Sequence, residues 1–331
     1  MSRSWKSFGA GGADVPFAKT CARAVRRLYG LDHPRAHWIA FKLVRLAWGV
    51  AGLSPIMARL PRLPVSVMGL DFPNPIGLAA GFDKDAALAG CLEVGGFGFV
   101  ESGTVKPLPE PGKSRGVAVM QVNLERKLTR RAHLPLGQAR QLLGISLGSN
   151  HEAWRETAIT DYLALMNALW RYADYLVINL SSPRDRDGMT RAHETPVRRL
   201  LERIRDHARE LGATTGKQVP VAVKVAVTAN QRNVPMTVQC VAEAGLQGIV
   251  AATEQTQSQA AICRQLRALS DYLGTLPLIS VGGIGSVDDA RKRMESGAAL
   301  VQLFTGVLRE GPFLARRIVA GLGQRQPDIG Q

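Results

Sequence analysis

Lys224 is the one charged residue inside an apolar run, Val221-Ala222-Val223-Lys224-Val225. An unpaired ammonium is costly to bury, so a lysine in such a run should be paired or should serve a ligand. It could neutralise the negative charge of a ligand or form a Schiff base with a carbonyl substrate. The alternative is a lysine at the edge of its strand, with its head in solvent.

Glycines and a serine follow other short apolar runs. Gly282-Gly283 comes directly after one run, and Thr305-Gly306 comes directly after another that ends at Phe304. Backbone N–H groups at such glycines can approach a phosphate closely, although tight turns use glycine too. Ser182 lies in Asn179-Leu180-Ser181-Ser182-Pro183, without the GxSxG context of a hydrolase nucleophile. We therefore interpret Ser182 as a proton acceptor.

Eight short apolar runs must position these groups, and helical patterns separate most of them. The predicted strands are 75–80, 97–102, 142–147, 175–180, 219–225, 248–253, 278–282 and 298–304. The predicted helices are 84–94, 153–171, 194–211, 233–245, 257–271, 286–297 and 311–322. The connection over 103–141 is longer, and we predict it to be irregular because it begins with a Pro-rich stretch.

Near-continuously apolar strands that alternate with helices predict parallel strands buried on both faces. Eight such strands close a (β/α)8 TIM barrel, whose usual size is about 250 residues. An open doubly wound sheet is the alternative, but no GxGxxG follows the first strand. In a barrel the active site lies at the C-terminal ends of the strands. That arrangement would gather Ser182, Lys224 and the glycine loops at one end.

The N-terminal part of the chain differs from the rest. We predict a flexible segment over 1–16, two helices over 17–62 and the barrel over 63–325. Eleven of the basic residues and two of the acidic ones fall in the first 62 positions, and the whole chain carries a net charge of +15. The second helix is also unusually apolar. Two hypotheses stand: the pair packs on the barrel, or it lies on an anionic membrane surface.

Composition excludes several classes of protein. With 331 residues, 46% of them hydrophobic, the chain can bury a large core, so a disordered protein is excluded. The four cysteines form no CxxC pair and there is no HExxH, so we predict no metal site and a reducing compartment. A secretory signal is not expected, whereas the Arg- and Ser-containing start loosely resembles a transit peptide. We predict no nucleic-acid partner.

Several long motifs, in chain order, resemble the dihydroorotate dehydrogenase family, specifically its class 2, quinone-dependent branch. The motifs are Leu31-Asp32-His33-Pro34-Arg35-Ala36-His37, the run from Asn74 to Asp85, Gly103-Thr104-Val105 with its Pro-rich tail, Asn179 to Pro183, and Val281 to Ile284. The resemblance covers roughly residues 20–320.

This resemblance implies a barrel that binds FMN and oxidises dihydroorotate to orotate in pyrimidine biosynthesis. The positions that match the flavin site are Ala80, Gly81, Lys84, Thr104, Asn179, Lys224, Gly282, Gly283, Phe304, Thr305 and Gly306. Ser182 matches the catalytic base, with Lys84 and Asn179 as further catalytic residues. A membrane quinone would reoxidise the flavin through residues 17–62. The implied location is peripheral, on the cytoplasmic side of a membrane, with a mitochondrial location as the alternative.

The substrate side departs from the family pattern. Of the asparagines that read the substrate in the family, only Asn179 is present. Arg184 follows the catalytic Ser-Pro, Asp185 stands where the family has the threonine of a proton relay, and Thr253-Glu254 replaces an Asn-Thr pair. An arginine can bind a carboxylate with two hydrogen bonds. We therefore predict Arg184, Thr253 and Glu254 as substrate residues.

Three other readings remain open at this point. The chain could be a divergent homologue with a different small-molecule substrate, such as another carboxylate. It could be a flavin-binding protein without activity, because fold does not fix function. It could be a phosphate-binding lyase that uses Lys224 as a Schiff base. The presence of Ser182, Lys84 and Lys224 favours the flavin oxidoreductase.

Overall fold

The computed structural model describes residues 42, 46, 61–88, 93–111, 114–131, 140–188, 190–228, 234–253 and 257–324. The predictions for residues 1–16 and for the two-helix segment over 17–62 lie almost wholly outside this part of the chain. Within it, no helix combines the length and the apolar character needed to cross a membrane.

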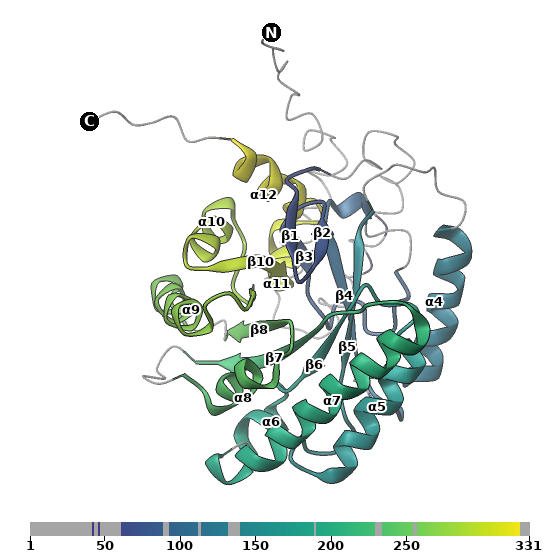
Figure 1. The fold of residues 1–331 in the computed structure, drawn as a ribbon. Coiled ribbons are helices and arrows are strands. Elements are labelled where there is room, and N and C mark those ends of the chain that lie inside the picture. Colours follow the sequence, from purple (N-terminus) through teal and green to yellow (C-terminus); the bar gives the residue numbers. More distant parts are fainter. Residues whose placement is uncertain are drawn as a thin grey trace.

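Eight parallel strands close a barrel, as predicted (Figure 1). The strands are β3 (Ile76–Leu78), β4 (Phe99–Val105), β5 (Leu142–Leu147), β6 (Tyr175–Asn179), β7 (Val221–Val227), β8 (Gly248–Thr253), β9 (Leu278–Val281) and β10 (Ala298–Leu303). They pair in chain order, and β10 closes the ring against β3 with Val301 opposite Ile76. All six residues of β5 are buried, because the barrel interior covers one face and helices cover the other.

Helices surround the barrel (Figure 1). They are α4 (Val117–Arg131), α5 (Glu156–Leu169), α6 (Pro183–Gly188), α7 (Glu194–Thr215), α8 (Met236–Ala244), α9 (Gln259–Leu273), α10 (Val287–Glu295), α11 (Thr305–Glu310) and α12 (Leu314–Gly323), with 3-10 turns at Glu93–Gly95 and Arg191–His193. Local sequence sets several ends. Ser286 caps α10 by accepting a hydrogen bond from the Asp289 N–H at 3.0 Å. Gly216 ends α7 in the left-handed conformation.

Two of the expectations for connections are wrong. Residues 84–88 of the helix predicted over 84–94 form turns instead. The carboxylate of Asp83 accepts hydrogen bonds from the N–H groups of Ala87 at 2.8 Å and Leu88, and this side-chain bonding competes with a helix. Conversely, the connection over 103–141 is not irregular throughout, because it contains α4. Met120 and Leu124, four positions apart, bury one face of that helix.

An antiparallel hairpin fills the N-terminal end of the barrel and was not predicted. It consists of β1 (Val65–Val67) and β2 (Leu70–Phe72), three residues each. Phe72 is fully buried and packs edge-to-face on Phe99 of β4, with ring centroids 5.2 Å apart. The interior cluster continues from there through Tyr175 to Val250. Side chains therefore occupy this end of the barrel, and polar chemistry is confined to the other end.

Candidate active site

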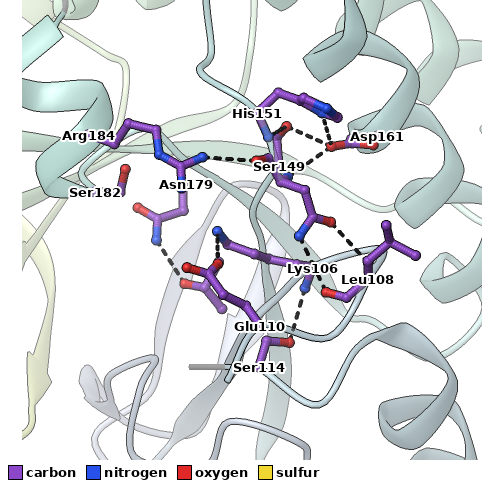
Figure 2. A network of polar contacts seen from close by, with 12 residues as sticks. Lys106, Leu108, Glu110, Ser114, Ser149, His151, Asp161, Asn179, Ser182 and Arg184 are labelled. Carbon is purple, nitrogen blue, oxygen red and sulfur yellow. Dashed lines mark hydrogen bonds and ion pairs between the residues drawn. The ribbon is translucent and has the colours of Figure 1, made fainter. Parts of the chain in front are cut away.

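A chain of hydrogen bonds links β4, β5 and β6 at the C-terminal end of the barrel. Asn179 Nδ2 donates to Thr104 Oγ1 at 2.7 Å, and Thr104 Oγ1 lies 3.1 Å from Ser146 Oγ. The amide oxygen of Asn179 accepts from both the N–H and the hydroxyl of Ser181. We call this C-terminal opening of the barrel the mouth, and Figure 2 shows Asn179 there. The network fixes the orientation of the Asn179 amide and of the Thr104 side chain.

Lys224 lies beside Asn179, because the register of β6 and β7 pairs these two residues. Its side chain is buried, and its Nζ lies 3.7 Å from Glu101 Oε1, an ion pair at more than hydrogen-bonding distance. Glu101 is fully buried and accepts a hydrogen bond from Gln302 Nε2 at 2.6 Å. Burial, and then the negative charge of Glu101, raise the pKa of Tyr175 well above its ordinary value. The lysine is thus paired, as its apolar run predicts.

The loop after β3 is tied to Gly103, near the end of β4, by backbone hydrogen bonds. The Gly81 N–H donates to the Gly103 carbonyl at 2.6 Å, and the Gly103 N–H donates to the Asp83 carbonyl at 3.0 Å. Gly81 has a φ of +97°, and a Cβ there would lie 3.6 Å from the ring of Phe304. The structure therefore brings Ala80-Gly81 from β3 and Phe304 from β10 to one side of the mouth.

Lys84 is exposed in the turn after β3 and lines a different hollow. That cavity, of about 650 Å³, is also lined by Glu110, Ser114 and Arg115. The catalytic role predicted for Lys84 stays a prediction.

The glycine loops after β9 and β10 meet as expected for a phosphate site. They line a cavity of about 390 Å³ together with Ile284, Ser286 and Arg309. Gly282 and Gly283 have φ of +112° and +67°, and a Cβ on Gly306 would lie 2.1 Å from the Ile284 carbonyl oxygen. Two acidic side chains, Asp289 and Glu310, also line the cavity. Asp289 is already engaged, since its carboxylate accepts from the Gly285 N–H at 3.0 Å.

Arg293 is a site residue that sequence reasoning missed. It lies on α10, is fully buried, and donates to Gln259 Oε1 at 2.9 and 3.0 Å, to Ser280 Oγ at 3.1 Å and to the Gly282 carbonyl at 3.0 Å. Burial lowers the pKa of its guanidinium. Arg293 thus holds the backbone of Gly282, the first glycine after β9, through the hydrogen bond to its carbonyl. A signal existed, because Arg293 follows the buried Ala290 at helical spacing on the inner face of α10.

Two cations, Arg184 and Lys106, act on the carboxylate of Asp185, which Ser182 contacts, and Figure 2 shows both cations and Ser182. Ser182 Oγ donates to Asp185 Oδ2 at 2.6 Å. Arg184 is exposed and donates to the Asn150 carbonyl at 2.9 Å. Lys106, which sequence reasoning also missed, follows β4, pairs with Glu110 and is largely buried. The loop at Pro107–Pro111 that holds Glu110 is what positions this lysine.

Thr253 and Glu254 are the other two residues predicted to contact the substrate. The Thr253 hydroxyl donates to the Val281 carbonyl at 3.1 Å, so it joins the ends of β8 and β9. Glu254 lies outside the described residues. No group of three or more His, Cys, Asp or Glu side chains in the described ranges could hold a metal ion.

The chain is similar to known proteins over most of its length. The family model of dihydroorotate dehydrogenase matches residues 62–124, 113–266 and 259–325. A protein of Stenotrophomonas maltophilia named dihydroorotate dehydrogenase (quinone) is 32% identical over 341 residues, which cover 90% of this chain and 95% of the relative. A relative of the same name from Escherichia coli is 33% identical and is covered over 97% of its length. These matches extend beyond residues 63–325, so they include part of the N-terminal segment.

Solved structures agree with this similarity. A dihydroorotate dehydrogenase from Eimeria tenella, in complex with ferulenol, superposes with a TM-score of 0.71 and 26% sequence identity, covering 90% of this chain and 94% of the other. The ligand-free form from the same organism gives a TM-score of 0.68 at 27% identity.

Proposed function

The chain belongs to the dihydroorotate dehydrogenase family, and from that premise we propose that it oxidises dihydroorotate with FMN as cofactor and a membrane quinone as electron acceptor. The observation that carries the proposal is that Ser182, Asn179, Thr104 and Lys224 meet at one barrel mouth in a chain whose relatives are named quinone-dependent dihydroorotate dehydrogenases. The inactive and lyase readings have no comparable support.

The residues at the mouth fit a flavin mononucleotide. The cavity at Gly283 and Thr305, of about 390 Å³, has room for a phosphate and offers backbone N–H groups to it. Lys224 on β7 supplies a buried positive charge inside the barrel. Arg309 supplies one positive charge beside the two acidic side chains, Asp289 and Glu310, that line the phosphate cavity. When bound, FMN would supply the hydride acceptor.

The residues of this chain would then perform three tasks. Lys224 would stabilise negative charge on the pyrimidine edge of the cofactor, in a site where low polarity strengthens the interaction. Asn179 would present its fixed amide to the substrate. Ser182 would accept a proton from the carbon of dihydroorotate that loses it. The substrate carboxylate would be recognised by Arg184 and Lys106, whose positive charges take over from the asparagines that this chain lacks.

The proposed location of the protein follows from its proposed electron acceptor. A quinone is held in a membrane, so we propose a peripheral attachment through residues 17–62, with their basic and apolar composition. Deleting residues 1–60 and following the protein between membrane and soluble fractions tests this proposal. Unchanged partitioning would exclude the segment as the anchor.

The test of the proposed activity is a visible absorption spectrum of the purified protein, followed by anaerobic addition of dihydroorotate. We expect a flavin spectrum that bleaches with the substrate and returns when a quinone analogue is added. Ser182→Ala should retain the flavin band and lose the bleaching. Thr214→Ala, which removes an exposed hydroxyl near the C-terminal end of α7, should behave as wild type. A flavin band that bleaches only with dithionite would contradict dihydroorotate as the substrate.

A further inference from the structure

The hydroxyl of Ser182 and the carboxylate of Asp185 form a closed pair at the start of α6. Ser182 Oγ donates to Asp185 Oδ2 at 2.6 Å, and the Asp185 N–H donates back to Ser182 Oγ at 3.2 Å. The other carboxylate oxygen accepts from the Ala153 N–H at 3.0 Å. Each oxygen of Asp185 is therefore engaged by a donor, and the direction of the Ser182 proton is set.

The surroundings of Asp185 favour a carboxylate that takes up a proton. Its side chain is only 6% exposed, and burial raises its pKa above the ordinary value. The charged groups that face it are Arg184 and Lys106, which oppose this rise. The phenol of Tyr162 on α5 faces it too, and its pKa is raised by burial and by the charge of Asp185. Burial raises the pKa and so makes Asp185 a stronger base than an exposed aspartate, while the hydrogen bonds from Ser182 and Ala153, and then the two cations, favour its ionised form.

A helix cap explains only half of this arrangement. An N-cap serine accepts from the N–H three residues on, as Ser182 does from Asp185. In a capping box the acidic side chain at that third position accepts in return from the backbone N–H of the cap residue. Here Asp185 accepts from the hydroxyl instead. A helix cap explains why the Ser182 oxygen accepts a hydrogen bond from the Asp185 N–H. It does not explain why the Ser182 hydroxyl donates to the Asp185 carboxylate.

The chemistry of the reaction supplies that reason. A neutral serine hydroxyl is too weakly basic to hold a second proton, so it must release its own proton as it receives one from the substrate. We propose that Asp185 is the proton acceptor of Ser182, so that the base of this enzyme is a Ser182–Asp185 pair. This inference rests on the proposed function.

In the proposed step, the C–H bond of the substrate breaks and its proton forms a new O–H bond on Ser182. The former hydroxyl proton of Ser182 moves to Asp185 Oδ2 along the 2.6 Å hydrogen bond. The electron pair of the broken C–H bond becomes the new C=C bond, while the neighbouring carbon gives up its hydride to the oxidant of the proposed function, FMN. Asp185 ends protonated and returns its proton to solvent before the next turnover.

The test compares anaerobic flavin reduction by dihydroorotate in wild type, Asp185→Asn and Asp174→Asn across pH. Asp174 is a matched control, because it is 9% exposed and accepts a backbone hydrogen bond from Leu143, yet lies at the other end of β6. We expect Asp185→Asn to keep its flavin band, to reduce it about 10²- to 10⁴-fold more slowly, and to lose the acidic limb of the pH profile. Asp174→Asn should keep both rate and profile.

A second measurement needs no substrate. Carboxyl-carbon NMR of the holoprotein should show the pKa of Asp185 rising by about one in Ser182→Ala, because a hydrogen bond to the ionised form is lost. Flavin reduction in Asp185→Asn within threefold of wild type, with an unchanged pH profile, would overturn the assignment and leave a helix cap. An unmoved pKa in Ser182→Ala would overturn it as well. If wild-type flavin ignores dihydroorotate, the proposed function fails, and the NMR result still decides whether the pair exists.

Discussion

The ammonium of Lys224 on β7 lies 3.7 Å from the buried carboxylate of Glu101 on β4, across the interior of the barrel. Two opposite charges thus share the layer directly beneath the mouth. The carboxylate is held in place by Gln302, which donates to it from β10 at 2.6 Å. Three strands far apart in sequence are therefore joined by one polar cluster, and the positive end of that cluster faces the site.

Breaking this pair should be costly. We expect Lys224→Met to lower the free energy of unfolding by about 3–5 kcal/mol, because Glu101 would be left buried without its counter-charge. The double variant Glu101→Gln with Lys224→Met should recover part of that loss, while FMN binding stays lost in both. Urea unfolding and flavin absorbance measure the two effects. A double variant no more stable than Lys224→Met alone would contradict the pairing as an energetic unit.

The proposed phosphate loop at Gly282-Gly283 allows a controlled glycine experiment. Gly283 and Gly216 have nearly the same positive φ, +67° and +68°. Alanine at either position should destabilise the fold by about 1–2 kcal/mol, because L-residues are strained there. Only Gly283→Ala should weaken FMN binding, since Gly283 lines the cavity whereas Gly216 ends α7, where a Cβ would meet nothing within 4 Å. Equal flavin affinity in the two variants, by fluorescence titration, would place the phosphate elsewhere.

Arg293 should stabilise the same loop, because it donates a hydrogen bond to the Gly282 carbonyl. Arg293→Met removes the donors to Gln259, Ser280 and the Gly282 carbonyl, and the buried Ser280 hydroxyl alone should lose about 1–3 kcal/mol. We expect a lower melting temperature and a flavin that dissociates more readily. Lys292→Met is the control, because that exposed lysine only pairs with Asp288 one turn away. Similar melting temperatures for the two variants would contradict this stabilising role.

The raised pKa of Asp185 also predicts how the free energy of unfolding depends on pH. Because its pKa is raised in the folded protein, the folded state retains this proton to higher pH than the unfolded state does. Its contribution is fully present below the ordinary carboxyl pKa of about 3.9 and is lost as the pH rises through the folded value. The stability of wild type relative to Asp185→Asn should therefore decline over that range and then level off. Urea titrations at several pH values measure the difference, and a difference that rises with pH would be the opposite of this expectation.

The sequence predicted the barrel because its signals are local. Runs such as Leu142–Leu147 and Gly248–Thr253 begin and end in the structure where their apolar pattern places them. Lys224 was identifiable because a charge in such a run is rare. The β1–β2 hairpin could not be predicted, because three-residue strands are too short to show a periodic pattern.

Contacts that depend on the closed fold could not be predicted. The hydrogen bonds of Arg293 reach Gln259, 34 positions away, and Gln302 reaches Glu101 over 201 positions. Nothing in the local sequence of either partner specifies the other. The Ser182–Asp185 pair is local, but its spacing is equally that of a helix cap, and only the observed direction of the hydroxyl distinguishes the two.

The pairing of β10 with β3 has a consequence for how the protein is made. Val301 is opposite Ile76, so the barrel stays open along one edge until almost the whole chain has been synthesised. At about 5–20 residues per second, β10 leaves the ribosome roughly ten to fifty seconds after β3. Throughout that interval the nascent chain presents an unpaired strand edge and lacks Thr305, which belongs to the proposed phosphate site. If the proposed function holds, cofactor uptake would have to wait for finished chains, and a ribosome-stalled fragment ending before residue 298 should depend on chaperones rather than on flavin supply.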